Sequence, residues 1–139
     1  GIIPPPSPAA AERPKMQKYG NSGLNHDRLD RIASKINLLM GQQRLFLEHE
    51  LSLWDLANRI GVTTHYASQA LNDRIGERFF DFVNGWRVRA AAERLRASDT
   101  TIMTVAYDVG FISRSSFYAA FKREFGTTPT QYRKAQCNG

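Results

Sequence analysis

The side chains best suited to chemistry lie in two short stretches of the sequence, at 64–72 and 114–122. In each stretch apolar residues recur at helical spacing, so the residues between them share the opposite, outward face of a helix. The outward positions are Thr64, His65, Ser68, Gln69 and Asn72 in the first stretch, and Arg114, Ser115, Tyr118, Ala119 and Lys122 in the second. Amide, imidazole, hydroxyl and basic groups of this kind can hydrogen-bond to base edges and phosphates.

The same residue types can form catalytic or metal sites, but their spacing here does not indicate one. The three histidines, His26, His49 and His65, lack the spacing of metal ligands. No glycine-rich phosphate loop follows a strand, and no nucleophile motif occurs. We therefore expect a protein that is not an enzyme, with no catalytic residue, no metal ion and no cofactor.

The charge of the chain suits a polyanionic partner and is unevenly distributed. The formal net charge is +6 and the isoelectric point is near 9.8. Residues 111–139 contain five basic residues and one acidic residue, whereas residues 26–75 contain six of each sign. We therefore expect the positive field to be concentrated at the C-terminal end of the chain.

Composition indicates whether the chain can fold and in which cellular compartment. Hydrophobic residues make up 42% of it, which is enough for a packed core and argues against global disorder. The single cysteine, Cys137, excludes an internal disulfide and fits a reducing compartment. There is no apolar run near 18 residues, so we expect a cytoplasmic fragment that makes no membrane contact. Gly1 in place of an initiator methionine indicates that a longer protein was cut or processed.

An internal repeat is the most informative pattern. Residues 56–76 (LANRIGVTTHYASQALNDRIG) match residues 105–126 (VAYDVGFISRSSFYAAFKREFG), with one extra residue in the turn of the second copy. In each copy a small residue allows two helices to cross closely, a glycine can take the left-handed conformation of a tight turn, and a hydroxyl residue can cap the next helix. The matched positions are Ala57 with Ala106, Gly61 with Gly110, and Thr63 with Ser113. The repeat predicts two helix-turn-helix units.

The remaining patterns predict an all-α fold with about seven helices. Apolar residues at three-to-four spacing begin near Asp27, and Gly41 is expected to end that helix. Ser52 is an expected N-cap, and Pro129 suits the first position of the last helix. The other helices are expected at about 63–74, 79–95, 101–109 and 114–125.

These helices divide into two lobes and a connecting helix. We expect a double helix-turn-helix domain at 26–135, with lobe 1 at about 26–78, a linker helix at about 79–95 and lobe 2 at about 99–135. The proline-rich residues 1–25 are expected to be a linker or N-terminal arm, and residues 136–139 a tail.

Three segments of the sequence resemble a known family. The segment VAYDVGFISRSSFYAAFKREFGTTPTQYRK at 105–134 resembles the second helix-turn-helix and C-terminal signature of AraC-type transcription regulators. Upstream, LSLWDLANRIGV at 51–62 and FFDFVNGWRVRAAAERL at 79–95 resemble the first half of the same domain, so the resemblance covers about 28–134. It implies sequence-specific binding of double-stranded DNA in transcription regulation, with two recognition helices in successive major grooves.

The resemblance also implies partners and a larger parent protein. It implies RNA polymerase as a partner and an N-terminal sensor or dimerisation region outside this chain, and it leaves activator and repressor as open alternatives. The segment KYGNSGLNHDRLDRIASKINLLM at 18–40 is similar to the one that joins this domain to a membrane-embedded sensor in one subset of the family. The parent protein is then membrane-anchored.

On this reading each outward residue has an expected role. The residues expected to read bases are Thr64, His65, Ser68, Gln69, Arg114, Ser115, Tyr118 and Ala119. The residues expected to contact phosphate are Asn72, Arg87, Ser116, Lys122, Arg123 and Arg133. Gln69 suits adenine, and the guanidinium of Arg114 suits the O6 and N7 atoms of guanine. For Arg87 two partners are open, a phosphate or an acid such as Asp108.

A helical protein-interaction module without DNA binding is the main alternative. Such a module would show no salt-dependent affinity for duplex DNA, and the basic C-terminal end argues against it. RNA binding would need an exposed aromatic platform, whereas the four-residue spacing of Phe117, Phe121 and Phe125 is typical of core residues.

Overall fold

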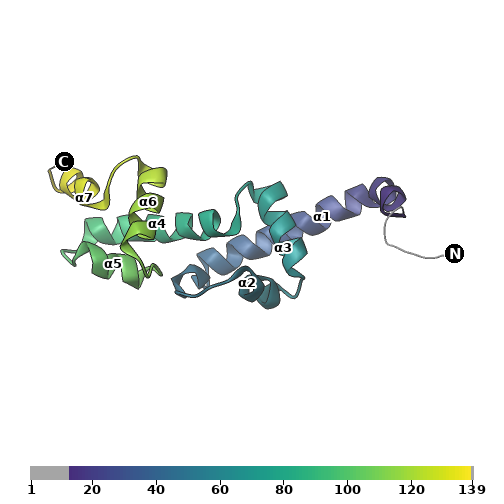
Figure 1. Cartoon of the computed structure of the whole chain (residues 1–139), viewed down its shortest axis with the longest axis horizontal. Helices are drawn as coiled ribbons and strands as arrows, with labels where there is room; N and C mark the ends of the chain where they lie inside the picture. The colour runs from purple at the N-terminus through teal and green to yellow at the C-terminus, as the bar shows by residue number, and fades with distance from the viewer. Residues whose placement is uncertain (1–12, 139) are drawn as a thin grey trace.

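The computed structural model describes residues 13–138, and within this range every regular element is helical. The elements are α1 (Arg13–Gly41), the 3-10 turn η1 (Leu45–Leu47), α2 (Leu53–Ile60), α3 (Thr64–Ala70), the π-helical turn η2 (Leu71–Ile75), α4 (Phe79–Ala97), α5 (Ile102–Asp108), α6 (Arg114–Phe125) and α7 (Pro129–Asn138). The seven α-helices and two lobes confirm the all-α prediction (Figure 1).

Lobe 1 consists of α1, η1, α2, α3 and η2, packed around the apolar face of α1. That face is formed by Leu29, Ile32, Ile36 and Met40, all of which are buried. The first turn of α4 closes the same core with Phe82 and Val83. Ser52 caps α2 through a reciprocal pair of bonds with Asp55, as the expected N-cap requires.

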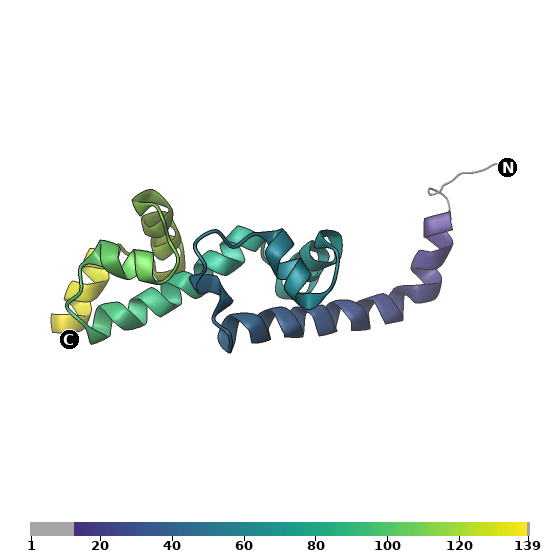
Figure 2. The same ribbon diagram turned by 90° about the horizontal axis from the view of Figure 1, so that it is seen from below.

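Lobe 2 consists of α5, α6 and α7, and its core is aromatic. Phe111, Phe117 and Phe121 are buried against one another and against the C-terminal half of α4, which contributes Val88 and Leu95. The core role predicted for Phe117 and Phe121 is confirmed, and Phe125 is half-buried against the same core. One helix, α4, therefore contributes to both cores and joins the lobes into an elongated molecule (Figures 1 and 2).

The two helix-turn-helix units have the predicted turn geometry. Gly61 and Gly110 have φ angles of 86° and 114°, in the left-handed region that favours glycine. The next residue donates its backbone N–H to Ala57 in the first unit and to Ala106 in the second, at 3.0 Å in each case. Both alanines are buried at the helix crossing.

Two predicted boundaries were wrong. Helix α1 begins at Arg13 instead of near Asp27, so residues 13–25 are helical and only the earlier part of the expected linker lies outside the described residues. Pro14 is compatible with this start, because a helix tolerates proline in its first turn. Helix α7 continues to Asn138 in place of the expected tail. The helix expected at about 63–74 is present as α3 and η2 together, and its last turn is π-helical, with Gly76 donating to the carbonyl of Leu71 at 2.6 Å.

No helix in the described range 13–138 combines the length and the apolar character needed to cross a membrane.

Candidate nucleic-acid interface

The outer face of α3 presents the polar side chains that the sequence predicted there. Thr63 caps the helix by accepting the backbone N–H of Tyr66 at 3.2 Å. Ala67, Ala70 and Leu71 are fully buried, as expected for the inward face. The opposite face carries exposed Thr64, His65 and Asn72 with half-buried Ser68 and Gln69.

The outer face of α6 is exposed along its length. Ser113 caps this helix by accepting the backbone N–H of Ser116 at 3.1 Å. The exposed residues are Arg114, Ser115, Ser116, Ala119 and Lys122. The guanidinium carbon of Arg114 lies 4.5 Å from the centre of the half-buried Tyr118 ring. This stacking restrains Arg114 in the first turn of α6 while its N–H groups stay open to a partner.

Two arginines expected to contact phosphate already have partners within the protein. Arg123 pairs with Asp81 on α4 at 2.8 Å. Arg133 donates to the carbonyls of Leu95 and Ser98 at the end of α4. Both contacts attach lobe 2 to the linker helix, so these charges are less available to a ligand than the sequence suggested.

Arg87 departs most from the expectation, because its donors are engaged by backbone carbonyls of lobe 1 and Asp108 has a different partner. It is buried beneath the junction of the lobes and donates to the carbonyls of Phe46 at 2.8 Å and Glu48 at 2.7 Å. Burial lowers the pKa of its guanidinium from the ordinary value. Asp108 instead pairs with Arg94 at 3.7 Å. The sequence could not show this, because the carbonyls lie about forty residues away along the chain.

The junction between the lobes is closely packed around the second turn. His49 stacks on Tyr107 with ring centres 4.1 Å apart, and its Nε2 atom lies 2.7 Å from the Tyr107 carbonyl. A Cβ atom at Gly110 would lie 2.5 Å from the Phe46 carbonyl oxygen and 2.6 Å from Nε of Arg87. Gly110 is therefore needed for close approach as well as for its backbone conformation, and the second turn is fixed directly against lobe 1.

A basic surface on α1 was not singled out from the sequence. Arg28, Arg31 and Lys35 are exposed on one side of this helix, and none of them takes part in an ion pair within the described residues. Asp30, on the same helix, pairs instead with Arg74 at 2.7 Å, and this hydrogen bond lowers the pKa of Asp30. The spacing of 28, 31 and 35 was the signal that could have indicated a shared face.

Comparisons with known proteins agree with this geometry. A family model described as a helix-turn-helix domain matches residues 56–135. An uncharacterised HTH-type transcriptional regulator of Staphylococcus aureus is 30% identical over 120 residues, covering 86% of this chain but 15% of the relative. A putative AraC-like transcription regulator of Streptomyces lividans is 32% identical over 80 residues, covering 58% of this chain and 26% of the relative. The chain thus spans about a sixth to a quarter of these relatives.

A solved structure supports the same assignment. The C-terminal domain of AraT, a response regulator from Geobacillus stearothermophilus, superposes with a TM-score of 0.64 and 28% identity, covering 77% of this chain and 84% of that one. The fold is therefore a double helix-turn-helix DNA-binding domain of the kind found in transcription regulators. The chain belongs to the AraC family of transcription regulators.

Proposed function

We propose that α3 and α6 are two recognition helices that one chain places in successive major grooves of the same duplex. The observation that carries this proposal is the duplicated unit, in which a left-handed glycine, a buried alanine and a hydroxyl cap recur and leave one exposed polar helix face each. Successive grooves on one side of a duplex recur about every 34–36 Å, so the expected site is asymmetric and about two turns long.

Base reading is assigned to the exposed faces of the two helices. On α6, Arg114 donates two hydrogen bonds to guanine, and Ala119 meets a thymine methyl group. On α3, Gln69 pairs with adenine, and His65 contacts guanine N7 or a phosphate. The remaining readers are Thr64, Ser68, Ser115 and Tyr118.

Phosphate contact is assigned to residues whose polar groups remain open. Lys122 and Ser116 on α6 and Asn72 beyond α3 are exposed and have no side-chain partner among the described residues. Arg123 and Arg133 act mainly in joining lobe 2 to α4, with phosphate contact as a secondary role. Arg87 is left out of the interface because its donors are buried on carbonyls.

The chain is further proposed to be the DNA-binding part of a longer regulator and to catalyse no reaction. The lengths of the curated relatives support this, since most of each relative lies outside the matched region. A sensor or dimerisation region and RNA polymerase are the proposed partners of the whole protein.

Selection of bound duplexes from a random pool, at stated salt, tests the proposal. Two enriched blocks about one helical turn apart, 10–10.5 base pairs from centre to centre, are expected. A single block would show that only one lobe reads bases, and no enrichment would overturn sequence-specific binding. The Arg114→Ala variant should lose enrichment at one position of one block and keep the other block.

A further inference from the structure

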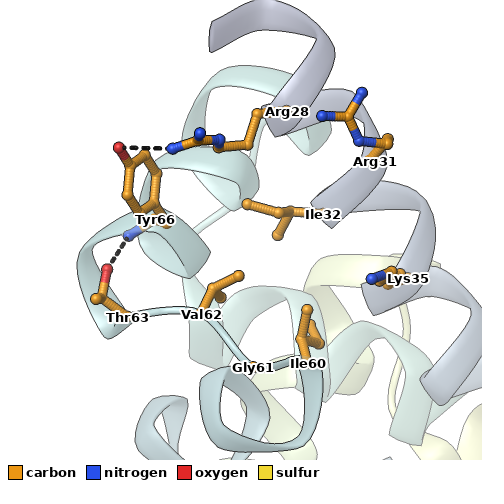
Figure 3. A pocket seen from close by; sticks show the side chains of 9 residues that line it. All are labelled: Arg28, Arg31, Ile32, Lys35, Ile60, Gly61, Val62, Thr63 and Tyr66. Carbon is orange, nitrogen blue, oxygen red and sulfur yellow. Dashed lines mark hydrogen bonds between the residues drawn. The ribbon is translucent and has the colours of Figure 1, made fainter. Parts of the chain in front are cut away.

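The three basic residues of α1 line an open pocket beside the first helix-turn-helix unit. The pocket has a volume of about 450 Å³ and lies between α1 and the turn that leads into α3 (Figure 3). Its lining contains three cations and no acid: Arg28, Arg31 and Lys35 at the rim, with Ile32, Ile60 and Val62 below them. A group of like charges around an apolar floor is unfavourable unless an anion neutralises it.

Tyr66 on α3 adds a hydrogen-bonding group to the pocket from the wall opposite α1. The hydroxyl oxygen of Tyr66 accepts a hydrogen bond from Arg28 at 3.1 Å, which leaves the hydroxyl hydrogen for another acceptor. The Arg28 guanidinium carbon also lies 5.2 Å from the centre of the Tyr66 ring, so Arg28 is held in place (Figure 3). Arg31 and Lys35 have no partner among the described residues, and their donors remain available.

The position of the pocket beside the start of α3 indicates which anion would bind there. Thr63, the N-cap of α3, is part of the lining, so the pocket adjoins the end of the helix that carries the first base readers. When a recognition helix enters a major groove by its N-terminal residues, the phosphates of the flanking strand come to lie beside that end. The chemistry of the pocket, several donors around a cationic rim, is the chemistry that binds a phosphate group.

We propose that this pocket binds one backbone phosphate next to the base pairs that α3 reads, with Arg31 and Lys35 as its main charges and Tyr66 and Arg28 as orienting donors. This inference rests on the proposed function, because it requires α3 to lie in the major groove. It gives lobe 1 an electrostatic grip on DNA that does not come from α3 itself, whose residues include no lysine or arginine.

The test compares the double variant Arg31→Gln/Lys35→Gln with the wild-type chain on the selected duplex. Neither residue makes an ion pair within the described residues, so the variant should keep its fold, which circular dichroism and thermal unfolding verify. Binding should weaken by about tenfold, the order of one charge-assisted hydrogen bond. The slope of log K against log salt should fall by about one, because one phosphate is no longer neutralised.

Phosphate ethylation interference locates the contact. In the wild-type complex, ethylation of one phosphate flanking the block read by α3 should block binding, and this effect should disappear in the variant. The matched control is Arg44→Gln, which removes an exposed positive charge of lobe 1 outside the pocket lining. A double variant that matches Arg44→Gln in affinity, slope and interference pattern would overturn the proposal.

Inorganic phosphate distinguishes the two sources of the anion. If the double variant binds DNA like the wild type but loses phosphate-induced amide shifts at Gly61–Thr63, the pocket serves a free phosphate compound and the DNA assignment is wrong. Failure of the proposed function would appear separately, as a wild-type chain that prefers no duplex before any variant is compared.

Discussion

Lobes 1 and 2 contain the same helix-turn-helix motif but hold their positive charge in opposite ways. In lobe 2, whose sequence is strongly basic, Arg123 and Arg133 are engaged with α4, and Arg114 and Lys122 remain on the outer face of α6. In lobe 1, whose signs cancel in sequence, Asp30, Glu48 and Asp55 have partners away from Arg28, Arg31 and Lys35, and these three cations of α1 remain free of ion pairs in the described range. The net charge of a segment therefore does not give the field at its surface.

The turns of the two helix-turn-helix units also differ, in how closely the rest of the protein approaches their glycines. A Cβ atom at Gly61 would meet open space, whereas one at Gly110 would meet the Phe46 carbonyl and Arg87. The first turn is thus shaped only by its own backbone, and the second is also shaped by lobe 1. The motif is local in one copy and part of the junction between the lobes in the other.

The largest expected effect is a difference in stability between alanine variants of the two turn glycines. Gly110→Ala should lower the free energy of unfolding by about 3 kcal/mol or more, since backbone strain adds to a clash with a carbonyl. Gly61→Ala should cost about 1–2 kcal/mol from backbone strain alone. Urea unfolding of both variants measures the difference, and equal losses would show that the second turn is not fixed by lobe 1.

Arg87→Met tests whether the junction, rather than DNA, is the partner of Arg87. Two carbonyls of lobe 1 would lose their donor, so we expect a loss of about 2–3 kcal/mol in unfolding free energy. The salt dependence of DNA binding should keep its slope. Unchanged stability combined with a slope lower by about one would restore the phosphate role expected from the sequence.

Arg114→Ala should cost about 1–3 kcal/mol in specific binding and relax one base position in the block read by lobe 2. The Tyr118→Phe variant keeps the ring beneath the guanidinium and removes only the hydroxyl, so it separates a base contact of Tyr118 from its support of Arg114. Competition assays on specific and random duplexes give the measurement. An equal loss on both would assign Arg114 to the backbone instead of a base.

Lys122 and Arg123 are adjacent, but only Arg123 has an acidic partner among the described residues. Lys122→Ala should lower the salt slope by about one, because an exposed cation without an ion pair is lost. Arg123→Ala should change the slope less, since Asp81 pairs with Arg123 at 2.8 Å. Equal slopes for both variants would show that the pair with Asp81 opens when DNA binds.

The smallest expected effect concerns acid stability in lobe 1. The hydrogen bond from Arg74 lowers the pKa of Asp30 below its ordinary value of 3.8, so the folded state is favoured while this carboxylate is ionised. The contribution is present above pH 3.8 and is lost as the pH falls through the lowered folded pKa. The melting temperature of Asp30→Asn should therefore lie below that of the wild type at neutral pH and approach it at acid pH. Asp27→Asn, an exposed acid without an ion pair in the described range, is the control, and a constant difference across pH would contradict the assignment.

Much of the fold was predictable from the sequence because its signals are local. The glycine, alanine and hydroxyl spacing of the repeat fixes each turn through backbone conformation and capping within about ten residues. The bounds of α6 match the prediction for the same reason. The start of α1 was missed because the prolines of residues 1–25 indicated a linker, whereas a proline in the first turn of a helix does not prevent that helix.

The outward faces of α3 and α6 were also set by the sequence, since burial of Ala67, Leu71, Phe117 and Phe121 fixes the rotation of each helix. The partners of the charged side chains were decided only by tertiary structure. Arg87 meets carbonyls about forty residues away, Arg123 meets Asp81 across α4, and the cations of α1 meet the turn before α3. Such pairings depend on distances between helices, which residue types and spacing along the chain do not encode.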